Sequence, residues 1–207
     1  MKREEKIKNL LVSNAINLIA EGGFEKATTR ELAYYSGNLP DIKMNEVYIY
    51  RLFGSKENVY AAAFIYLDDE LFDAFKSAIR AVGGFTEDVK EHLYQFFLLA
   101  WRFILKNEVH CRCYVRYYYS IYFRDESKER HKKKFDSIIV PMAAIFKEDA
   151  NVSAILHSVF TAVLDFAIRV YNGELENNDD SRHHIFNVLY CMMATYFRES
   201  VQQEGCR

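Results

Sequence analysis

The sequence is poor in the residues that interrupt regular structure. Its 207 residues include only 8 glycines and 2 prolines. A fold of many short strands or long loops needs frequent turn signals, which glycine and proline supply, so their scarcity argues against such a fold. The apolar residues, 50% of the chain, recur mainly at the spacings of three and four that helices produce. The expected fold class is therefore all-α.

The sequence also has few cysteines, little net charge and no long apolar run. The 4 cysteines, two of them in Cys111-Arg112-Cys113, make no disulfide framework for a chain of this length, which favours a reducing cytoplasm. A formal net charge of −2 argues against a coat of basic surface. No run approaches the ~18 consecutive apolar residues of a membrane span, and asparagines interrupt the first apolar stretch, unlike in a signal peptide. We therefore expect a cytoplasmic protein with no membrane partner.

Two helices are predicted at the start of the chain. The first carries an apolar stripe that ends at Gly22-Gly23, a suitable C-terminal stop. Thr28 and Glu31 then match a capping box, in which the hydroxyl and the carboxylate each satisfy free backbone N–H groups. This predicts a short second helix from Thr28 to about Tyr35. The stripe of the first helix comprises Ile7, Leu10, Leu11, Ala15, Leu18 and Ile19.

Two further N-caps follow in the next twenty or so residues. Asn45 is a good N-cap for a third helix of about two turns, Glu46 to Leu52. Ser55, directly after Gly54, caps a fourth and much longer helix. Three short helices, with a glycine-containing turn between the second and the third, followed by a long helix, form the layout of a helix-turn-helix DNA-binding head.

The segments "TTRELAYYSG" and "YIYRLFGSKENVY" resemble the two halves of the signature of TetR-type transcriptional regulators. In that signature a Thr-led second helix ends at Ala-Gly, and a recognition helix ends in Tyr-x-x-Phe before Ser-Lys-Glu. The resemblance covers about residues 7–67. It implies an all-α, tetracycline-repressor-like fold with a three-helix helix-turn-helix head over residues 1–54. A C-terminal helical body for ligand binding and dimerisation would follow over residues 55–207, beginning with a connecting helix.

The head offers side chains suited to the phosphates of double-stranded DNA. Lys56 adds positive charge to helix N-terminal N–H groups that already favour an anion, although it could also be a solvated lysine. The Thr28 or Thr29 hydroxyl could donate to a phosphate, with a pure capping role equally open for Thr28. Arg30 could reach a guanine edge or a phosphate, or be an ordinary exposed arginine.

By their match to the family motif, three residues are expected on the groove face of the recognition helix: Asn45, Tyr48 and Tyr50. Asparagine can pair with adenine, while tyrosine can touch a thymine methyl group and a phosphate. Gly37 and Tyr50 are 13 positions apart, more than in the family pattern, so Asn38 to Lys43, "NLPDIK", looks like an insertion. The expected DNA-binding residues are Thr28, Thr29, Arg30, Asn45, Tyr48, Tyr50 and Lys56.

The segment 114–123 is unusually rich in tyrosine. Tyrosine hydroxyls need partners when buried, so these rings could line a cavity for a small, partly apolar effector, or could form a packed aromatic core. The expected cavity lies between a helix over residues 87–106, this segment and a helix over residues 152–172. Asp165 has Arg169 four positions on and could simply form an ion pair. The expected ligand-binding residues are Phe97, Trp101, Tyr118, Tyr122, Phe160 and Asp165.

The last two predicted helices have the most regular apolar patterns. They could form an intramolecular core. The resemblance instead implies a four-helix bundle across a two-fold axis, which makes a homodimer able to meet both half-sites of a palindrome.

No motif indicates an enzyme, a metal site or a cofactor. His110, Cys111, Cys113 and His131 could be metal ligands, but Cys-x-Cys on a helix points the two thiols to different sides and no second pair completes a tetrahedral set. The function expected from the resemblance is a ligand-responsive transcriptional regulator, most simply a repressor that a small molecule releases from a palindromic operator. The alternative is a helical, dimeric binding or scaffold protein with a degenerate DNA-binding head.

Overall fold

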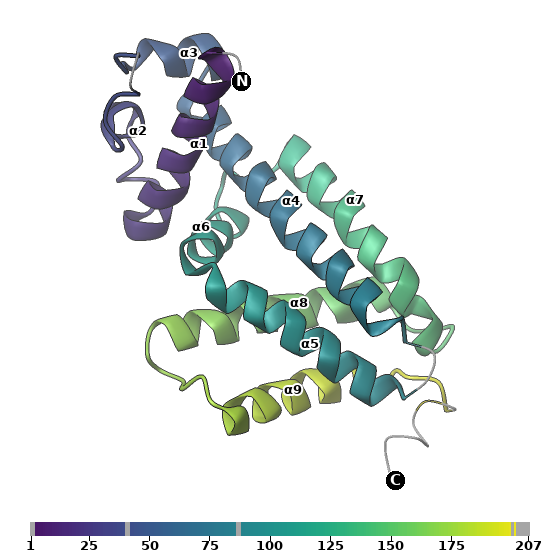
Figure 1. Cartoon of the computed structure of the whole chain (residues 1–207). Helices are drawn as coiled ribbons and strands as arrows, with labels where there is room; N and C mark the ends of the chain where they lie inside the picture. Colours follow the sequence, from purple (N-terminus) through teal and green to yellow (C-terminus); the bar gives the residue numbers. More distant parts are fainter. Residues whose placement is uncertain (1–2, 40–41, 86–87, 200, 202–207) are drawn as a thin grey trace. The chain divides into compact units, whose positions relative to one another are not determined.

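The computed structural model describes residues 3–39, 42–85, 88–199 and 201 of the chain. The regular elements of these ranges are helices, α1 to α9 and one short 3₁₀ turn, so the predicted all-α class is confirmed (Figure 1). The chain forms two compact units, the first made of Met1–Glu70 and Glu108–His131, the second of Leu71–Asn107 and Lys132–Arg207. Residues 108–131, which were expected to belong to the C-terminal body, therefore pack with the head helices in the first unit.

The first unit begins with the helix-turn-helix elements. Gly23, at φ 76°, follows the last residue of α1 and donates its N–H to the Ile19 carbonyl at 3.0 Å, which ends the helix where the sequence predicts. The Thr28 hydroxyl accepts the Glu31 N–H at 3.2 Å, so the hydroxyl half of the predicted capping box forms, whereas the Thr28 N–H donates to the Lys26 carbonyl at 2.9 Å. Its helices are α1 (Arg3–Gly22), α2 (Thr29–Tyr34), α3 (Val47–Phe53), the start of α4 (Lys56–Val82), α6 (Glu108–Tyr118) and the start of α7 (Asp125–Met142).

Two polar side chains fix α1 to its neighbours within this unit. The fully buried Asn14 donates its amide to the Leu32 carbonyl of α2 at 2.8 Å and accepts the Ser36 hydroxyl at 2.5 Å. Arg116 of α6 donates to the Ile19 carbonyl at 2.7 Å, near the end of α1. Because buried polar groups cost free energy unless they are hydrogen-bonded, these contacts specify how the three helices pack.

Tyr114 and Tyr117 of the tyrosine-rich segment lie in the core of the first unit, whereas Tyr119 is exposed. Phe64 of α4 stacks on Tyr114 and Tyr117, with ring centroids 5.0 and 4.6 Å apart. The Tyr117 hydroxyl donates to the Tyr122 carbonyl at 2.9 Å and lies 3.1 Å from the Ser127 hydroxyl. The structure therefore supports the packed aromatic core that the sequence left open as an alternative.

The second unit contains the rest of α4 and α7 together with α5 (Val89–Lys106), α8 (Val152–Tyr171) and α9 (Asp179–Ala194). The predicted start of α5 at residues 86–87 lies outside the described residues; Asp88 caps the helix by accepting the Glu91 N–H. Helix α7 ends at Met142, and the 3₁₀ turn Ala143–Ile145 follows it directly.

Candidate DNA-binding and ligand sites

The corner between α3 and α4 is held by short-range hydrogen bonds. Gly54 takes φ 79° and donates its N–H to the Tyr50 carbonyl at 3.0 Å, a backbone conformation that suits glycine. The Ser55 hydroxyl accepts the Asn58 N–H at 3.2 Å, and the Asn58 amide donates to the Phe53 carbonyl at 2.6 Å. The first turn of α4 is therefore fixed to the end of the recognition helix.

An open hollow lies beside this corner and is lined in part by Ser55 and Glu57. Four residues predicted to bind DNA also line it, from α2, α3 and α4: Thr28, Thr29, Tyr50 and Lys56. A helix N-terminus, hydroxyl groups and an ammonium group together suit a phosphate oxygen. The Thr28 oxygen accepts a backbone N–H, which leaves its hydroxyl hydrogen able to donate to an anion.

Arg30 lies in a different hollow, with Glu31, Tyr34 and Glu46. Two carboxylates face that hollow, so it suits a phosphate less well than the Lys56 hollow does. Arg30 is exposed and long enough to extend away from both acids.

The three residues predicted for the groove face differ in exposure. The Asn45 side chain accepts the Val47 N–H at 3.0 Å, so it supports the start of α3 while its amide group stays exposed. Tyr50 is 57% exposed. Tyr48 is half-buried, its hydroxyl accepts from Arg3 at 3.5 Å, and Arg51 lies 4.9 Å from its ring centroid.

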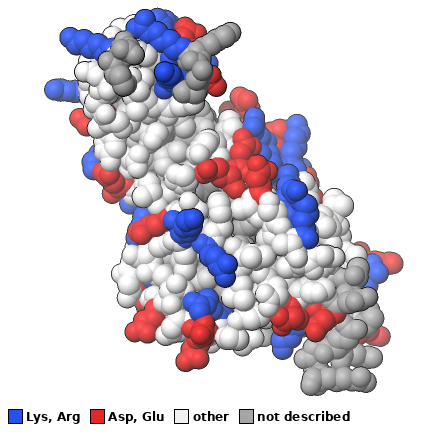
Figure 2. All heavy atoms as spheres, in the orientation of Figure 1, with Lys and Arg blue, Asp and Glu red and all other residues white. Residues whose placement is uncertain are grey.

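Arg3 and Arg51 are basic residues that the sequence analysis did not single out. Arg51 lies in the last turn of α3 and is also 3.7 Å from Glu4, an exposed ion pair. Figure 2 shows several Lys and Arg side chains around α3 and the start of α1 on the drawn face. Spacing on the recognition helix could have indicated Arg51, because it follows Tyr48 by three positions.

The segment identified as an insertion is anchored at both ends. The Asn38 side chain accepts the Met44 N–H at 2.7 Å, and Ile42 donates its N–H to the Leu39 carbonyl at 3.0 Å. Ile42 and Met44 are buried, whereas Lys43 between them is exposed. The extra residues therefore belong to the packed head where they are described.

The second unit contains a cavity of about 90 Å³. Its 16 described lining residues are all apolar, 7 of them phenylalanines, and come from α4, α5, α7, α8 and α9. The predicted ligand residues Phe97 and Phe160 are among them. Tyr118 and Tyr122 are not, because they belong to the first unit. Asp165 is exposed and pairs with Arg169 at 2.9 Å, the simple ion pair that its spacing allowed.

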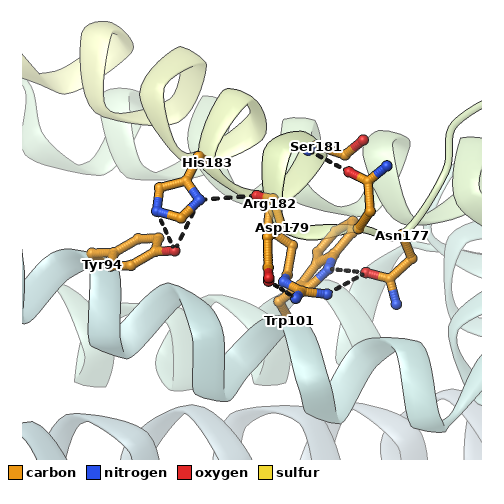
Figure 3. A network of polar contacts seen from close by, with 8 residues as sticks. Tyr94, Trp101, Asn177, Asp179, Ser181, Arg182 and His183 are labelled. Carbon is orange, nitrogen blue, oxygen red and sulfur yellow. Dashed lines mark hydrogen bonds and ion pairs between the residues drawn. The ribbon is translucent and has the colours of Figure 1, made fainter.

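Trp101 lies behind the cavity wall instead of lining it. It is only 2% exposed, and its ring stacks on Phe97 with centroids 5.7 Å apart. Its indole N–H donates to the Asn177 side-chain oxygen at 3.4 Å, and Arg182 donates to the same oxygen at 3.3 Å (Figure 3). The tryptophan thus ties α5 to the segment that precedes α9.

A second pair of side chains joins α5 to α9 nearby. Figure 3 shows the Tyr94 hydroxyl beside the imidazole of His183, 2.9 Å from its Nε2. His183 Nδ1 lies 2.9 Å from the Asp179 carbonyl, so Nδ1 carries a hydrogen and Nε2 can accept from the tyrosine. The Tyr94 ring packs on Phe186 of the cavity wall, with centroids 4.9 Å apart.

The cysteines and histidines considered as metal ligands have other surroundings. Burial raises the pKa of the Cys113 thiol to about 12, so it stays protonated near neutral pH. His110 Nδ1 lies 2.9 Å from the Glu70 carboxylate, and His131 Nδ1 lies 2.9 Å from Asp68. Within the described ranges, no three His, Cys, Asp or Glu side chains are grouped so that they could hold a metal ion.

No protein-family model and no curated protein matches the sequence. Solved structures do match over most of the chain. A TetR family transcription regulator from Marinobacter aquaeolei VT8 has a TM-score of 0.72 at 17% identity, covering 92% of this chain and 96% of that one. The TetR family regulator PfmR from Thermus thermophilus has a TM-score of 0.60 at 17% identity, covering 88% and 96%. A TetR-like regulator from Rhodococcus sp. RHA1 has a TM-score of 0.63 at 15% identity, covering 91% and 96%. The predicted resemblance is thus confirmed at the level of structure, and the chain has the fold of the TetR family transcription regulators.

Proposed function

We propose that this protein is a transcriptional regulator that binds duplex DNA through α2, α3 and the start of α4. The hollow that brings together Thr28, Thr29, Tyr50 and Lys56 is the observation that carries the proposal. These groups would hold one backbone phosphate and so orient α3 in the major groove, while exposed Asn45 and Tyr50 would meet base edges. Such a protein works in the cytoplasm, where the DNA is.

The proposed assembly is a homodimer through α8 and α9. Helix α8 is apolar and long enough, by length and composition alone, to cross a membrane, and 22% of its most apolar stretch is buried within this chain. Several of its apolar side chains, such as Ile155, Phe166 and Ile168, are half-buried, so a second copy that packs on α8 would bury them further. Val188 and Cys191 of α9 are exposed and would extend the same contact. Two heads would then face two half-sites of a palindrome.

Ligand response is proposed to pass through α4. This continuous helix contributes Lys56 to the phosphate-sized hollow and Phe72 and Phe75 to the cavity wall. An effector in the cavity would favour a dimer conformation whose heads no longer match successive major grooves, and so release the operator. The protein would then be a repressor.

Selection from a random duplex library tests the DNA-binding proposal. We expect the ligand-free protein to enrich a palindromic sequence at low ionic strength, with an affinity at least about a thousandfold above that for non-specific duplex. A helical scaffold with a degenerate head would give only weak binding without sequence preference. Failure to enrich any sequence would end the regulator proposal.

Lys56→Ala should weaken binding to all duplexes alike, because a phosphate contact carries no sequence information. The slope of log affinity against log salt should fall by about one unit for each phosphate that the variant no longer neutralises, hence by about two in a symmetric dimer. Lys76→Ala, which removes a lysine later in α4 and outside the hollow, is the matched control. Equal slopes for Lys56→Ala and the unaltered protein, measured by fluorescence anisotropy, would remove Lys56 from the interface.

A further inference from the structure

The cavity of the second unit offers a bound molecule no polar group among its described lining residues. A buried hydroxyl, amide or charge without a hydrogen-bond partner costs several kcal/mol, so the part of a ligand that enters must be uncharged and lack hydrogen-bonding atoms. On the α5–α9 side, Tyr94 and His183 are hydrogen-bonded to each other, and the Tyr94 ring packs on the wall residue Phe186.

The size of the cavity restricts the shape of the part of the ligand that enters it. At about 90 Å³ it is smaller than the apolar cavities of roughly 150 Å³ that admit benzene. Its phenylalanine rings meet at centroid distances near van der Waals contact, for example 6.0 Å between Phe72 and Phe75 and 6.2 Å between Phe72 and Phe160. A thin aliphatic chain can pass between such rings, whereas a rigid polycyclic group would have to displace several of them.

Two methionines in the wall allow the cavity to lengthen. Met142 of α7 and Met193 of α9 both line it. Their unbranched side chains change rotamer at low cost, so a flexible ligand can gain room that a close-packed wall of branched residues would deny.

We propose that the effector of this protein inserts an unbranched, uncharged hydrocarbon chain, end first, into this cavity and leaves its polar group outside. The inference rests on the proposed ligand response and specifies its chemistry. Each further methylene group of the chain should then raise affinity about fourfold, until the chain is longer than the cavity. Beyond that length affinity should level off or fall.

The n-alkanols from butanol to decanol are suitable probes, and the full-length protein supplies its own reporter. Trp101 is its only tryptophan and stacks on Phe97 of the cavity wall, so its fluorescence should respond to occupancy. The α,ω-diol of the tightest-binding alkanol is the matched control ligand. Insertion would bury its second hydroxyl, so it should bind at least about tenfold more weakly.

Two variants locate the probe. Ala100→Leu fills the cavity from α5 and should weaken alkanol binding at least about tenfold, whereas Ala81→Leu, at an exposed position of α4, should not. If Ala100→Leu unfolds, Val163→Ile adds a single methyl group to the wall and should shorten the preferred chain by about one carbon. Affinity independent of chain length, a diol that binds as well as its alkanol, or equal binding by the cavity variants and the control would each overturn the proposal.

DNA binding measured in the same samples separates this inference from the proposed function. If a selected operator is bound but no alkanol binds, the hydrocarbon proposal fails and the regulator stands. If alkanols bind as described but the protein enriches no operator, the cavity assignment holds and the regulator fails.

Discussion

Replacement of Trp101 by alanine should lower the free energy of unfolding by about 3 to 5 kcal/mol. The indole is almost fully buried, stacks on Phe97 and donates a hydrogen bond to Asn177, so truncation leaves a void and removes that hydrogen bond. Urea denaturation followed by circular dichroism measures the change without the need for the indole fluorophore.

Trp101→Phe separates the two contributions to this loss. It keeps most of the apolar contact with Phe97 but removes the N–H, so it should cost less than the alanine variant by at least about 1 kcal/mol. A loss below about 1 kcal/mol in Trp101→Ala would mean that the indole lies at the edge of an open pocket, as the sequence suggested.

Asp68→Ala should lower the free energy of unfolding by a similar amount, about 3 to 5 kcal/mol. In the first unit the Asp68 carboxylate lies 2.9 Å from His131 Nδ1 and accepts the Tyr114 hydroxyl at 3.1 Å, and all three side chains are buried. Removal of the acid takes away two hydrogen bonds to a carboxylate, while the Tyr114 hydroxyl and His131 Nδ1, which lie 3.3 Å apart, remain out of water. Denaturation curves of the single variant and of the unaltered protein give the difference.

The neighbouring residue provides the control. Asp69 forms an exposed pair with Arg130 at 3.1 Å, and Asp69→Ala should change stability by no more than about 1 kcal/mol, because exposed pairs are screened by water. Replacement of both Asp68 and His131 by leucine, together with Tyr114→Phe, should recover much of the loss, since apolar side chains need no partner. If this triple variant is no more stable than Asp68→Ala, the loss comes from packing and not from the polar contacts.

Local signals in the sequence were sufficient to predict most of the helix-turn-helix. The caps at Thr28 and Ser55 depend on hydroxyl groups that accept the N–H three positions on, and the stop after Gly22 depends on the positive φ of Gly23, so short stretches of sequence reveal them. The hollow beside Lys56 lies where the start of α2, the end of α3 and the start of α4 meet.

The ligand site required contacts that sequence spacing does not contain. Tyrosines 118 and 122 lie in the first unit because α6 packs on α1, a pairing across about ninety residues that no periodicity predicts. Phe97 lines the cavity, whereas Trp101 lies behind its wall. This difference depends on the hydrogen bond of Trp101 to Asn177, which lies 76 positions away in the sequence. The apolar face of α5 was visible in the sequence, but which of its rings border a void was not.

Because little of α8 is fully buried within one chain, the stability of the folded protein should depend on its concentration. If a second copy covers α8, folding is coupled to dimerisation. The fraction of folded chains then rises with protein concentration. Newly made chains would pass through a state in which the apolar side chains of α8 are only partly buried, and would be open to proteases and to self-association until they meet a partner. The number of copies in a cell would then set the lifetime of each copy, so that a weakly expressed gene would yield disproportionately little working regulator.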